Sequence, residues 1–304
     1  MVRANLQNHP RTMLITGATG FIGSRLATMA LGKAYRVKTL SRSDWTDVPA
    51  IPRTGRYLGN LPAQIPVEAL QGTDVVVHCA ADIQAQEKVA HAVNVEGTIR
   101  LAELSRHEGV ESFIFISSQS ARPDALSAYG RTKYAAEQAI LSIDGIHIVI
   151  VRPGLVIGPG STGLYHRLSR MVESMPVLPL LGGGRSIVQP IHVDDLCAAI
   201  FKCDQSSHEL HKSVLNLGHP QGVTLAEFLQ AIAVARLGRR KMTLSIPLWP
   251  AEIVVGWAEA LGIPLPISSG NLKGLRIVER METEADMARL DVNVRPVDAM
   301  LRNS

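Results

Sequence analysis

The stretch Met13-Leu14-Ile15-Thr16-Gly17-Ala18-Thr19-Gly20-Phe21-Ile22-Gly23 decides the fold of this 304-residue chain. Its first three residues form an apolar run typical of a buried strand, and the residues from Phe21 to Ala30 have the periodicity of a helix. The glycines between them permit a tight turn and a close approach of the backbone to a pyrophosphate, which the helix N-terminus favours electrostatically. The stretch predicts a dinucleotide-binding turn, with an ordinary glycine-rich turn as the alternative.

Length and composition indicate a globular chain with ample core. Hydrophobic residues make up 46% and charged residues 19% of the sequence, which excludes a disordered protein. A chain of this length is expected to divide into a large nucleotide-binding domain and a smaller lobe. The net charge of +4 comes from scattered Lys and Arg residues without interleaved aromatics, so we expect no nucleic-acid partner.

The cysteines point to a reducing compartment. Cys79, Cys197 and Cys203 contain no CxxC pair, which argues against a disulfide framework and against a zinc site. The first dozen residues lack an apolar core of the kind found in secretory signals, and we interpret them as a disordered leader. We therefore expect a cytoplasmic protein without a bound metal.

The segment from Leu248 to Ile267 is apolar enough to suggest a membrane span. It also contains Glu252, Glu259 and three prolines, which are unfavourable in a helix that faces lipid. We expect a buried or surface-docked helix and no integral membrane segment.

Strand and helix patterns alternate through the first half of the chain. Such alternation predicts right-handed crossovers and a doubly wound parallel sheet, a Rossmann-type α/β fold. After the first helix, strands are expected at Tyr35–Leu40, Val75–Cys79, Phe113–Ile116 and Ile146–Val151, and helices through Val93–Leu104 and over Ser127–Ile140.

The composition of the sequence changes at Gly158, after which glycine and proline become frequent. We expect a dinucleotide-binding domain over residues 12–157 and a smaller substrate-binding lobe over 158–304. Residues 186–204 are expected to return to the first domain, with a late strand near Ser186–Val193. Amphipathic helices are predicted at Leu225–Leu237 and Met281–Arg289.

The pair Tyr129 and Lys133 is the second functional signal. Four residues apart on a predicted helix, the two side chains share one face. A phenol with a pKa near 10 exchanges protons near neutral pH only beside a cation that favours the phenolate. Lys133 is placed to supply that cation and to hold a ribose hydroxyl, although a surface pair is the alternative.

Other motifs occur in an order that strengthens this interpretation. Ser117-Ser118-Gln119-Ser120 follows an expected strand, and Asn94 stands in the preceding predicted helix. Together with the glycine turn, they resemble the extended short-chain dehydrogenase/reductase family from about Met13 to Asp195. The resemblance implies that Ser118 orients the substrate oxygen, with Ser117 and Ser120 as fallbacks, and that Asn94 supports a link to the active-site lysine. Turn chemistry at the serines and a helix N-cap at Asn94 are the alternatives.

The same resemblance implies the cofactor contacts. In the family, the segments matching His78-Cys79-Ala80-Ala81, Gly59-Asn60-Leu61 and Arg152-Pro153-Gly154-Leu155-Val156 lie along the dinucleotide. The residues expected to bind it are Gly17, Thr19, Gly20, Phe21, Ile22, Gly23, Arg42, Asn60, Leu61, Cys79, Ala80, Ala81, Asn94, Ser117, Tyr129, Lys133, Pro153, Gly154 and Val156.

Arg42 decides which cofactor is expected. An NAD site needs an acidic residue for the ribose 2′-hydroxyl at the end of the second strand, whereas a 2′-phosphate needs a cation. Arg42 stands in the place of that carboxylate, and Asp44 follows two residues later. The sequence favours NADP and leaves NAD open.

Two departures from the family narrow the reaction. Gln119-Ser120 replaces the Asp-Glu pair that dehydratases of the family use for elimination, so water loss is not expected. The arginine that grips a diphosphate in sugar-nucleotide enzymes is replaced by Val188, with Arg185 nearby as a speculative substitute. The Gln-Pro-Ile-His-Val form of this segment looks like the NADPH-binding accessory subunit of respiratory complex I.

We therefore expect an NAD(P)-dependent oxidoreductase that transfers hydride between the nicotinamide and a carbonyl or secondary alcohol of a small molecule. Tyr129 would act as the acid, Lys133 would lower its pKa, Ser118 would orient the oxygen and Asn94 would support proton relay. A sugar-nucleotide 4-epimerase and a non-catalytic NADPH-binding accessory or sensor protein are the alternatives. The resemblance also implies a homodimer.

Overall fold

The structure is a computed structural model that describes residues 10–33, 35–43, 52, 55–83, 87–247, 280–302 and 304. Contacts divide the chain into two compact units. Unit 1 comprises residues 1–121, 132–152 and 197–215, and unit 2 comprises 122–131, 153–196 and 216–304. Residues 197–204, part of the segment expected to return to the first domain, lie in unit 1.

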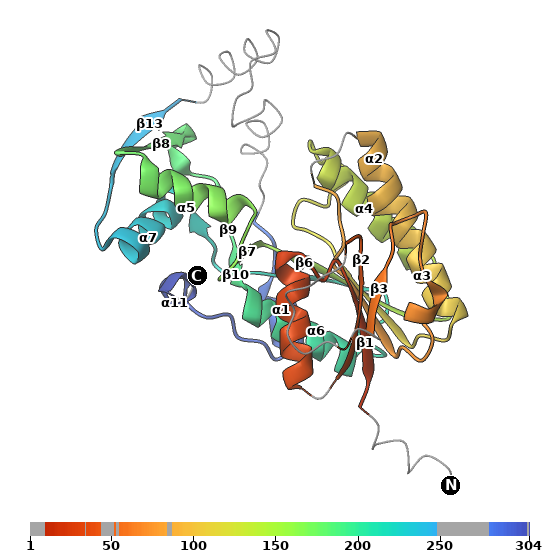
Figure 1. The fold of residues 1–304 in the computed structure, drawn as a ribbon. Helices are drawn as coiled ribbons and strands as arrows, with labels where there is room; N and C mark the ends of the chain where they lie inside the picture. Colours follow the sequence, from red (N-terminus) through yellow and green to blue (C-terminus); the bar gives the residue numbers. More distant parts are fainter. Residues whose placement is uncertain are drawn as a thin grey trace. The chain divides into compact units, whose positions relative to one another are not determined.

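A seven-stranded sheet with the order β11-β6-β5-β4-β1-β2-β3 forms the centre of unit 1 (Figure 1). All six strands from β1 to β6 pair in parallel, which confirms the Rossmann-type fold class. The strands are β1 (Thr12–Thr16), β2 (Arg36–Ser41), β3 (Arg56–Leu58), β4 (Val75–His78), β5 (Ser112–Ile116), β6 (His147–Pro153) and β11 (Ser213–Leu217).

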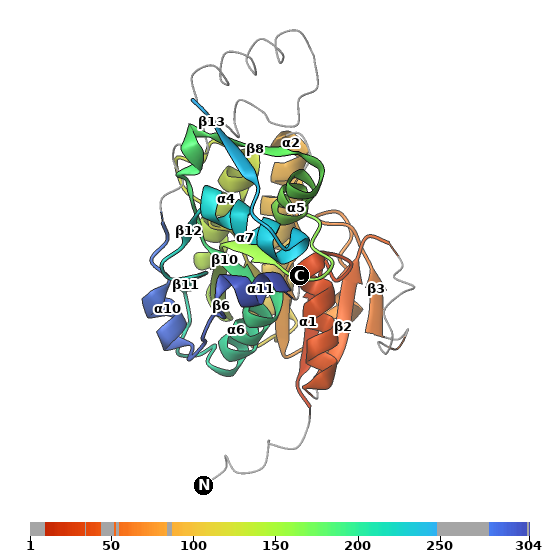
Figure 2. The same ribbon diagram turned by 90° about the vertical axis from the view of Figure 1, so that its left-hand side faces the viewer.

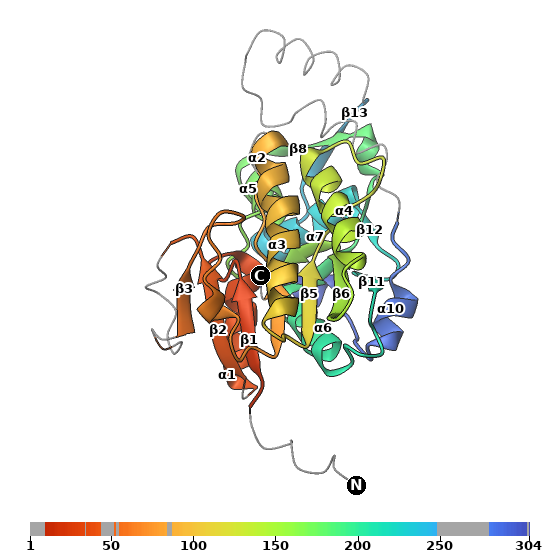
Figure 3. The same ribbon diagram turned by 90° about the vertical axis from the view of Figure 1, so that its right-hand side faces the viewer.

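Helices cover both faces of this sheet. α1 (Phe21–Gly32) and α6 (Val193–Gln205) lie on one face, whereas α3 (Gly97–His107) and α4 (Ala128–Leu141) lie on the other (Figures 2 and 3). A short helix α2 (Glu87–His91) and a π-helical turn η3 (Ala92–Glu96) lead into α3. Coverage on both faces explains why β1, β4 and β5 are uniformly buried and why β5 is apolar from Phe113 to Ile116.

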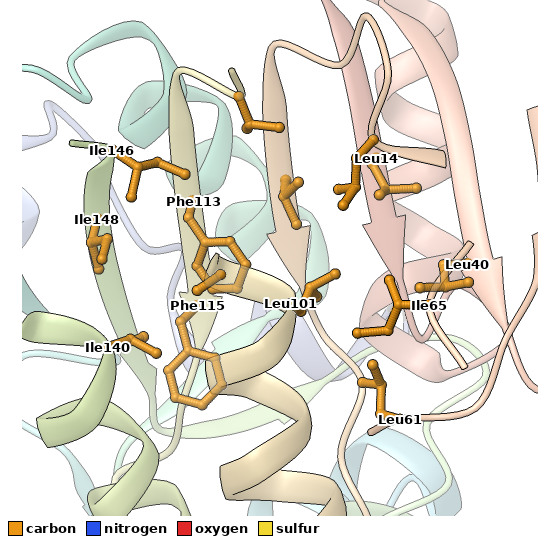
Figure 4. Packing of buried hydrophobic residues seen from close by; sticks show 14 of the residues in the cluster. Leu14, Leu40, Leu61, Ile65, Leu101, Phe113, Phe115, Ile140, Ile146 and Ile148 are labelled. Atoms are coloured by element: carbon orange, nitrogen blue, oxygen red, sulfur yellow. The ribbon is translucent and has the colours of Figure 1, made fainter. Parts of the chain in front are cut away.

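An apolar cluster lies between the sheet and the helices α3 and α4 (Figure 4). Phe113 and Phe115 point from β5 into this cluster with no exposed surface, and they meet Leu101 of α3 and Ile140 of α4. Burial of side chains of this size stabilises the fold by about 2 kcal/mol each. The cluster therefore fixes α4, the helix of Tyr129 and Lys133, against the sheet.

His78 joins three elements of unit 1 at the end of β4. Its ring is fully buried and lies 2.6 Å from the Thr16 hydroxyl of β1 and 3.0 Å from the Thr98 hydroxyl of α3. Burial, together with the nearby Lys133, lowers the pKa of His78 to about 3. The ring is therefore neutral at physiological pH and serves as a hydrogen-bonding link.

Unit 2 is built around α5 (Leu164–Ser174) and α7 (Leu225–Leu237), which pack on a separate apolar cluster. Among the described residues of unit 2 the strands form three small sheets, in which β7 (Leu155–Ile157) pairs with β10 (Pro190–His192), β9 (Ile187–Val188) with β12 (Val223–Thr224), and β8 (Val177–Leu181) with β13 (Met242–Ile246). The short helices η2 (Val67–Ala69) in unit 1 and η4 (Gly182–Gly184), α10 (Glu284–Arg289) and α11 (Val297–Arg302) in unit 2 complete the described elements.

One expected strand is placed differently from the prediction. The strands found between Ile187 and His192 pair with β12 and β7, so the strand expected near Ser186–Val193 does not join the central sheet. The additional strand of that sheet is β11, whose alternation of half-buried and buried residues suits an edge position. The helices expected at Leu225–Leu237 and near Met281–Arg289 are present, and the segment from Leu248 to Ile267 lies outside the described residues.

The neutral state of His78 makes a prediction about stability. Because its folded-state pKa of about 3 lies below the ordinary value of 6.5, its contribution is complete above pH 6.5 and is lost as the pH falls toward 3. The free energy of unfolding, measured in urea between pH 7.5 and 4.5, should fall by up to about 1.4 kcal/mol per pH unit from this group. His78→Gln should be less stable at pH 7.5 but have a shallower pH dependence, and equal slopes in the two proteins would contradict the account.

Candidate dinucleotide and catalytic site

A cavity opens at the carboxyl ends of the central strands of unit 1, where open α/β sheets bind their ligands. Its wall combines the turn after β1, the ends of β2 and β4 and the segment after β3. The lining residues are Thr16, Gly17, Thr19, Gly20, Leu40, Ser41, Arg42, Gly59, Asn60, Leu61, Cys79, Ala80, Ala81, Asp82 and Val93. Most of the cofactor contacts expected in the first 81 residues thus share one cavity.

The glycine turn is shaped for close approach. Gly17 has a φ of +64°, and a Cβ on it would lie 2.7 Å from the backbone nitrogen of Ala80. The N–H of Gly20 donates to the carbonyl of Gly17 at 2.9 Å, and a Cβ on Gly23 would lie 2.4 Å from that carbonyl. The turn therefore requires glycine at two of its three glycine positions, and it leaves the cradle open for a pyrophosphate at the start of α1.

The end of β2 presents a cation to the same cavity. Ser41 is buried and its hydroxyl donates to the carbonyl of Ser43 at 2.8 Å, which shapes the turn. Arg42 is exposed and lines the cavity. Asp44, the possible carboxylate for an NAD site, lies outside the described residues.

Asn94 lies in the π-helical turn η3 and is buried, so it is not a helix N-cap. Its side-chain oxygen accepts from the N–H of Asp82 at 2.7 Å, and its amide donates to the carbonyl of Asp82 at 2.9 Å and to the hydroxyl of Thr132 at 3.2 Å. Asn94 therefore ties the segment after β4 to the residue next to Lys133. Single-turn π segments are frequent at functional sites.

Lys133 is almost fully buried, with 1% of its surface exposed. Its ammonium donates to the carbonyl of Ile116 at 2.7 Å and lies 4.3 Å from the ring centre of Phe115. Burial lowers the pKa of Lys133 to about 8, and the neighbouring Cys79 and Glu137 oppose that shift. A buried lysine with this pKa, beside the end of β5, is a group suited to proton chemistry near neutral pH.

The serines after β5 have separate partners. The Ser117 hydroxyl donates to the carboxylate of Glu137 and is buried, whereas Ser118 and Ser120 are half-buried with their hydroxyls 2.9 Å apart. Tyr129 is half-buried on α4, one helical turn before Lys133. Of the three serines proposed for the substrate oxygen, Ser117 is thus the one committed to a buried carboxylate.

Several expected contacts do not line the cavity. Phe21, Ile22 and Gly23 form the first turn of α1, and Pro153, Gly154 and Val156 lie in unit 2. Asn94, Ser117 and Lys133 are buried in unit 1, whereas Tyr129 is half-buried and belongs to unit 2. The cavity wall also contains residues that the sequence analysis did not single out, namely Thr16, Leu40, Ser41, Gly59, Asp82 and Val93. Five of them adjoin residues that were singled out, so contiguity in sequence could have found them.

Within the described ranges, no cluster of His, Cys, Asp or Glu is arranged to hold a metal ion. His192 ends β10 and Asp194 lies in the first turn of α6, where the Asp194 N–H donates to the His192 ring at 3.2 Å. Asp195 binds the guanidinium of Arg295. Among all the residues that the structure describes, no helix has the length and apolar character needed to cross a bilayer.

A parallel sheet with a glycine turn opening onto a cavity at its carboxyl edge defines a dinucleotide-binding protein of the Rossmann type. The chain belongs to the NAD dependent epimerase/dehydratase family, whose model matches residues 13–218. It is thereby an NAD(P)-dependent oxidoreductase of the extended short-chain dehydrogenase/reductase type.

Relatives within this family carry different activities. The chain is 30% identical over 288 residues to a ceramide reductase of Caulobacter vibrioides, which covers 90% of this chain and 87% of that protein. It is 28% identical over 270 residues to a UDP-glucose 4-epimerase of Vibrio cholerae, with coverage of 79% and 80%. The fold resembles that of MoeE5 in complex with UDP-glucuronic acid and NAD, with a TM-score of 0.74, 23% identity and coverage of 96% and 97%.

The geometry of Gly17 predicts the effect of replacing it. Gly17→Ala places a Cβ at positive φ and 2.7 Å from the Ala80 nitrogen, which should lower the free energy of unfolding by about 1–3 kcal/mol and abolish cofactor binding measured by calorimetry. The matched control is Gly32→Ala at the end of α1, the helix that follows the turn. No atom lies within 4 Å of the carbon added there. Wild-type binding by Gly17→Ala would show that the cofactor does not use this turn.

Proposed function

We propose that this protein catalyses NADPH-dependent reduction of a carbonyl group, or the reverse oxidation, with Tyr129, Lys133 and Ser118 as its catalytic residues. The observation that carries the proposal is the buried ammonium of Lys133, held at the carbonyl of Ile116 and directly before the serine segment. Burial of the Lys133 ammonium costs free energy, and a tyrosine–lysine pair on the protein surface would not carry that cost. Its placement supports proton transfer beside the cofactor cavity.

In this proposal each side chain has one role. Tyr129 donates a proton to the substrate oxygen during reduction, and the positive charge of Lys133 stabilises the phenolate that remains. The Ser118 hydroxyl orients the substrate oxygen, and Asn94 holds the segment after β4 and Thr132 in place. A bound nicotinamide supplies the hydride for the carbon atom.

The preference for NADP rests on Arg42. A guanidinium binds a phosphate through paired, charge-assisted hydrogen bonds, and Arg42 lies on the cavity wall at the end of β2. We therefore assign the ribose 2′-phosphate to the surroundings of Arg42 and Ser41, both of which line the cavity.

For the substrate, we favour a keto group on an apolar molecule. The relatives include the ceramide reductase and a 2-alkyl-3-oxoalkanoate reductase of Stenotrophomonas maltophilia. In unit 2, Gln189 does not offer its amide to a ligand: it binds the backbone of Met281 at 2.9 and 2.6 Å and the carbonyl of His219 at 3.3 Å. Val188 beside it offers no charge to a diphosphate, for which Arg185, three residues earlier and exposed, is the alternative cation.

The similarity to the UDP-glucose 4-epimerase favours sugar-nucleotide 4-epimerisation as a second candidate. The two reactions are separated by assaying NADPH oxidation with a panel of long-chain and cyclic ketones and, in parallel, interconversion of UDP-sugars. The reductase proposal predicts activity only in the first assay. Activity only in the second would replace it, and tight NADPH binding with neither activity would favour an accessory protein.

Two further properties belong to this proposal. The three cysteines are free thiols, which supports a reducing compartment such as the cytoplasm. The homodimer implied by the family resemblance stays a prediction, which size-exclusion chromatography with light scattering tests directly.

Tyr129→Phe should abolish catalysis while sparing cofactor binding. Removal of a general acid costs about 10²–10⁴-fold in kcat, and the phenyl ring preserves the packing of the site. Steady-state kinetics with the best ketone of the panel, together with the Kd of NADPH, measure both effects. Tyr134→Phe, five residues later on the same helix, is the control and should retain wild-type kcat. Equal kcat in Tyr129→Phe and wild type would remove Tyr129 from the mechanism.

Arg42→Ala should weaken NADPH binding selectively. Loss of a hydrogen bond to a charged group costs about 1.5–3 kcal/mol, so the KM for NADPH should rise about 10–100-fold while the KM for NADH changes little. The control is Arg36→Ala, which removes the same charge from the opposite end of β2. A parallel rise of both KM values would place the 2′-phosphate elsewhere.

A further inference from the structure

A buried carboxylate lies behind the proposed active site and has no role in the chemistry described above. Glu137 stands one helical turn after Lys133 on α4, and its surface is completely buried. An ionised carboxylate without water is destabilising unless charged or hydrogen-bonding partners surround it. Its partners therefore show what Glu137 holds together.

Glu137 receives hydrogen bonds from β6 and from the residue that directly follows β5. The Arg152 guanidinium of β6 donates through Nε to Oε1 at 2.8 Å and through a terminal nitrogen to Oε2. The Ser117 hydroxyl, directly after β5, donates to Oε1. A bidentate arginine with a third donor compensates for burial and fixes the orientation of the carboxylate.

The hydrogen bonds of Glu137 and of Lys133 reach adjacent residues after and at the end of β5. Ile116 accepts the Lys133 ammonium at 2.7 Å, Ser117 is bound by Glu137, and Ser118 is the hydroxyl assigned to the substrate. The N–H of Ser117 also donates to the carbonyl of Val151 at 2.7 Å. α4 packs over β5 and β6 on this face of the sheet (Figure 3), so one carboxylate joins the helix to both strand ends.

We propose that Glu137 is a positioning residue of the reductase site: its carboxylate fastens Ser117, and through it Ser118, to α4 and β6, and it supplies the anion that the Lys133 ammonium requires. This inference rests on the proposed function for the roles of Ser118 and Lys133. Glu137 itself touches neither substrate nor cofactor.

The charges around Lys133 support the second half of the proposal. On its own helix Lys133 faces Glu137, and on β4 and directly after it lie the neutral His78 and Cys79. Burial raises the pKa of the Cys79 thiol to about 12, so Cys79 carries no charge at neutral pH. Arg152 is paired with Glu137, beside Tyr134. Of the two groups that oppose the desolvation of Lys133, Cys79 and Glu137, Glu137 is the carboxylate, and it lies one helical turn from Lys133 on α4.

The test measures the titration of Lys133 directly in the protein without cofactor. In protein labelled with [ε-¹³C]lysine, the ¹³Cε shift of Lys133, assigned with Lys133→Arg, is followed between pH 6 and 11. Glu137→Gln should move the titration midpoint down by about one pH unit or more, because the charge that favours the ammonium is lost. The matched control Glu103→Gln, on the exposed side of α3, should leave the midpoint unchanged.

Ser117→Ala tests the positioning half without altering the charge. It should lower kcat about tenfold, as expected for the loss of one hydrogen bond to a charged group, and leave both the KM for NADPH and the Lys133 midpoint unchanged. Ser117→Ala also provides the test of the positioning role if Glu137→Gln does not fold. An unmoved Lys133 midpoint in Glu137→Gln, an equal shift in Glu103→Gln, or wild-type kcat in Ser117→Ala would overturn the proposal.

The titration separates this inference from the proposed function. If Tyr129→Phe kept full activity, the catalytic assignment would fail, whereas the Lys133 midpoint would still report whether Glu137 supplies the anion. If Tyr129→Phe were inactive and the midpoint unmoved, the function would stand and the role of Glu137 would fall.

Discussion

The burial of the Lys133 ammonium is the constraint on which the proposed chemistry depends. A lysine without solvent needs acceptors and an opposing charge at fixed positions, and unit 1 provides the Ile116 carbonyl, the face of Phe115 and the Glu137 carboxylate. Each of these groups is held by the central sheet or by α4. The rigidity of the site is therefore a consequence of the way the sheet and α4 pack together.

The parallel direction of the strands explains why the proposed cofactor-binding turn and the serines after β5 lie at one edge of the sheet. All strands from β1 to β6 run in parallel, so the glycine turn, the small residues after β4 and the serines after β5 follow carboxyl ends on one side. Gly17 lies against Ala80 with no room for a side chain. Close approach of these two segments keeps the cradle narrow enough for a pyrophosphate, while Asn94 holds the chain that follows.

The sequence predicted what local pattern determines. Continuous apolar runs identified β4 and β5, periodicity identified α7, and glycine spacing identified the turn before α1, because each of these signals depends on neighbours in the chain. Contacts between segments distant in the sequence could not be predicted from such local signals. Three features depend on tertiary packing. They are the pairing of β9 with β12 and of β10 with β7, the edge position of β11, and the hydrogen bonds of Asn94 to Asp82 and Thr132. Glu137 had no sequence signal of its own, since an acidic residue on a helix is ordinarily exposed.

The division into two units separates two kinds of requirement. Unit 1 holds the candidate cofactor cavity and the buried polar network around Lys133, in which Ser117, Glu137 and Arg152 are joined by hydrogen bonds. In unit 2, the side chain of Gln189 forms hydrogen bonds with the backbone of Met281 and His219, so its amide is engaged within the unit. We expect family members with different activities to share this network, and to differ in the lobe that the sequence predicts to bind the substrate.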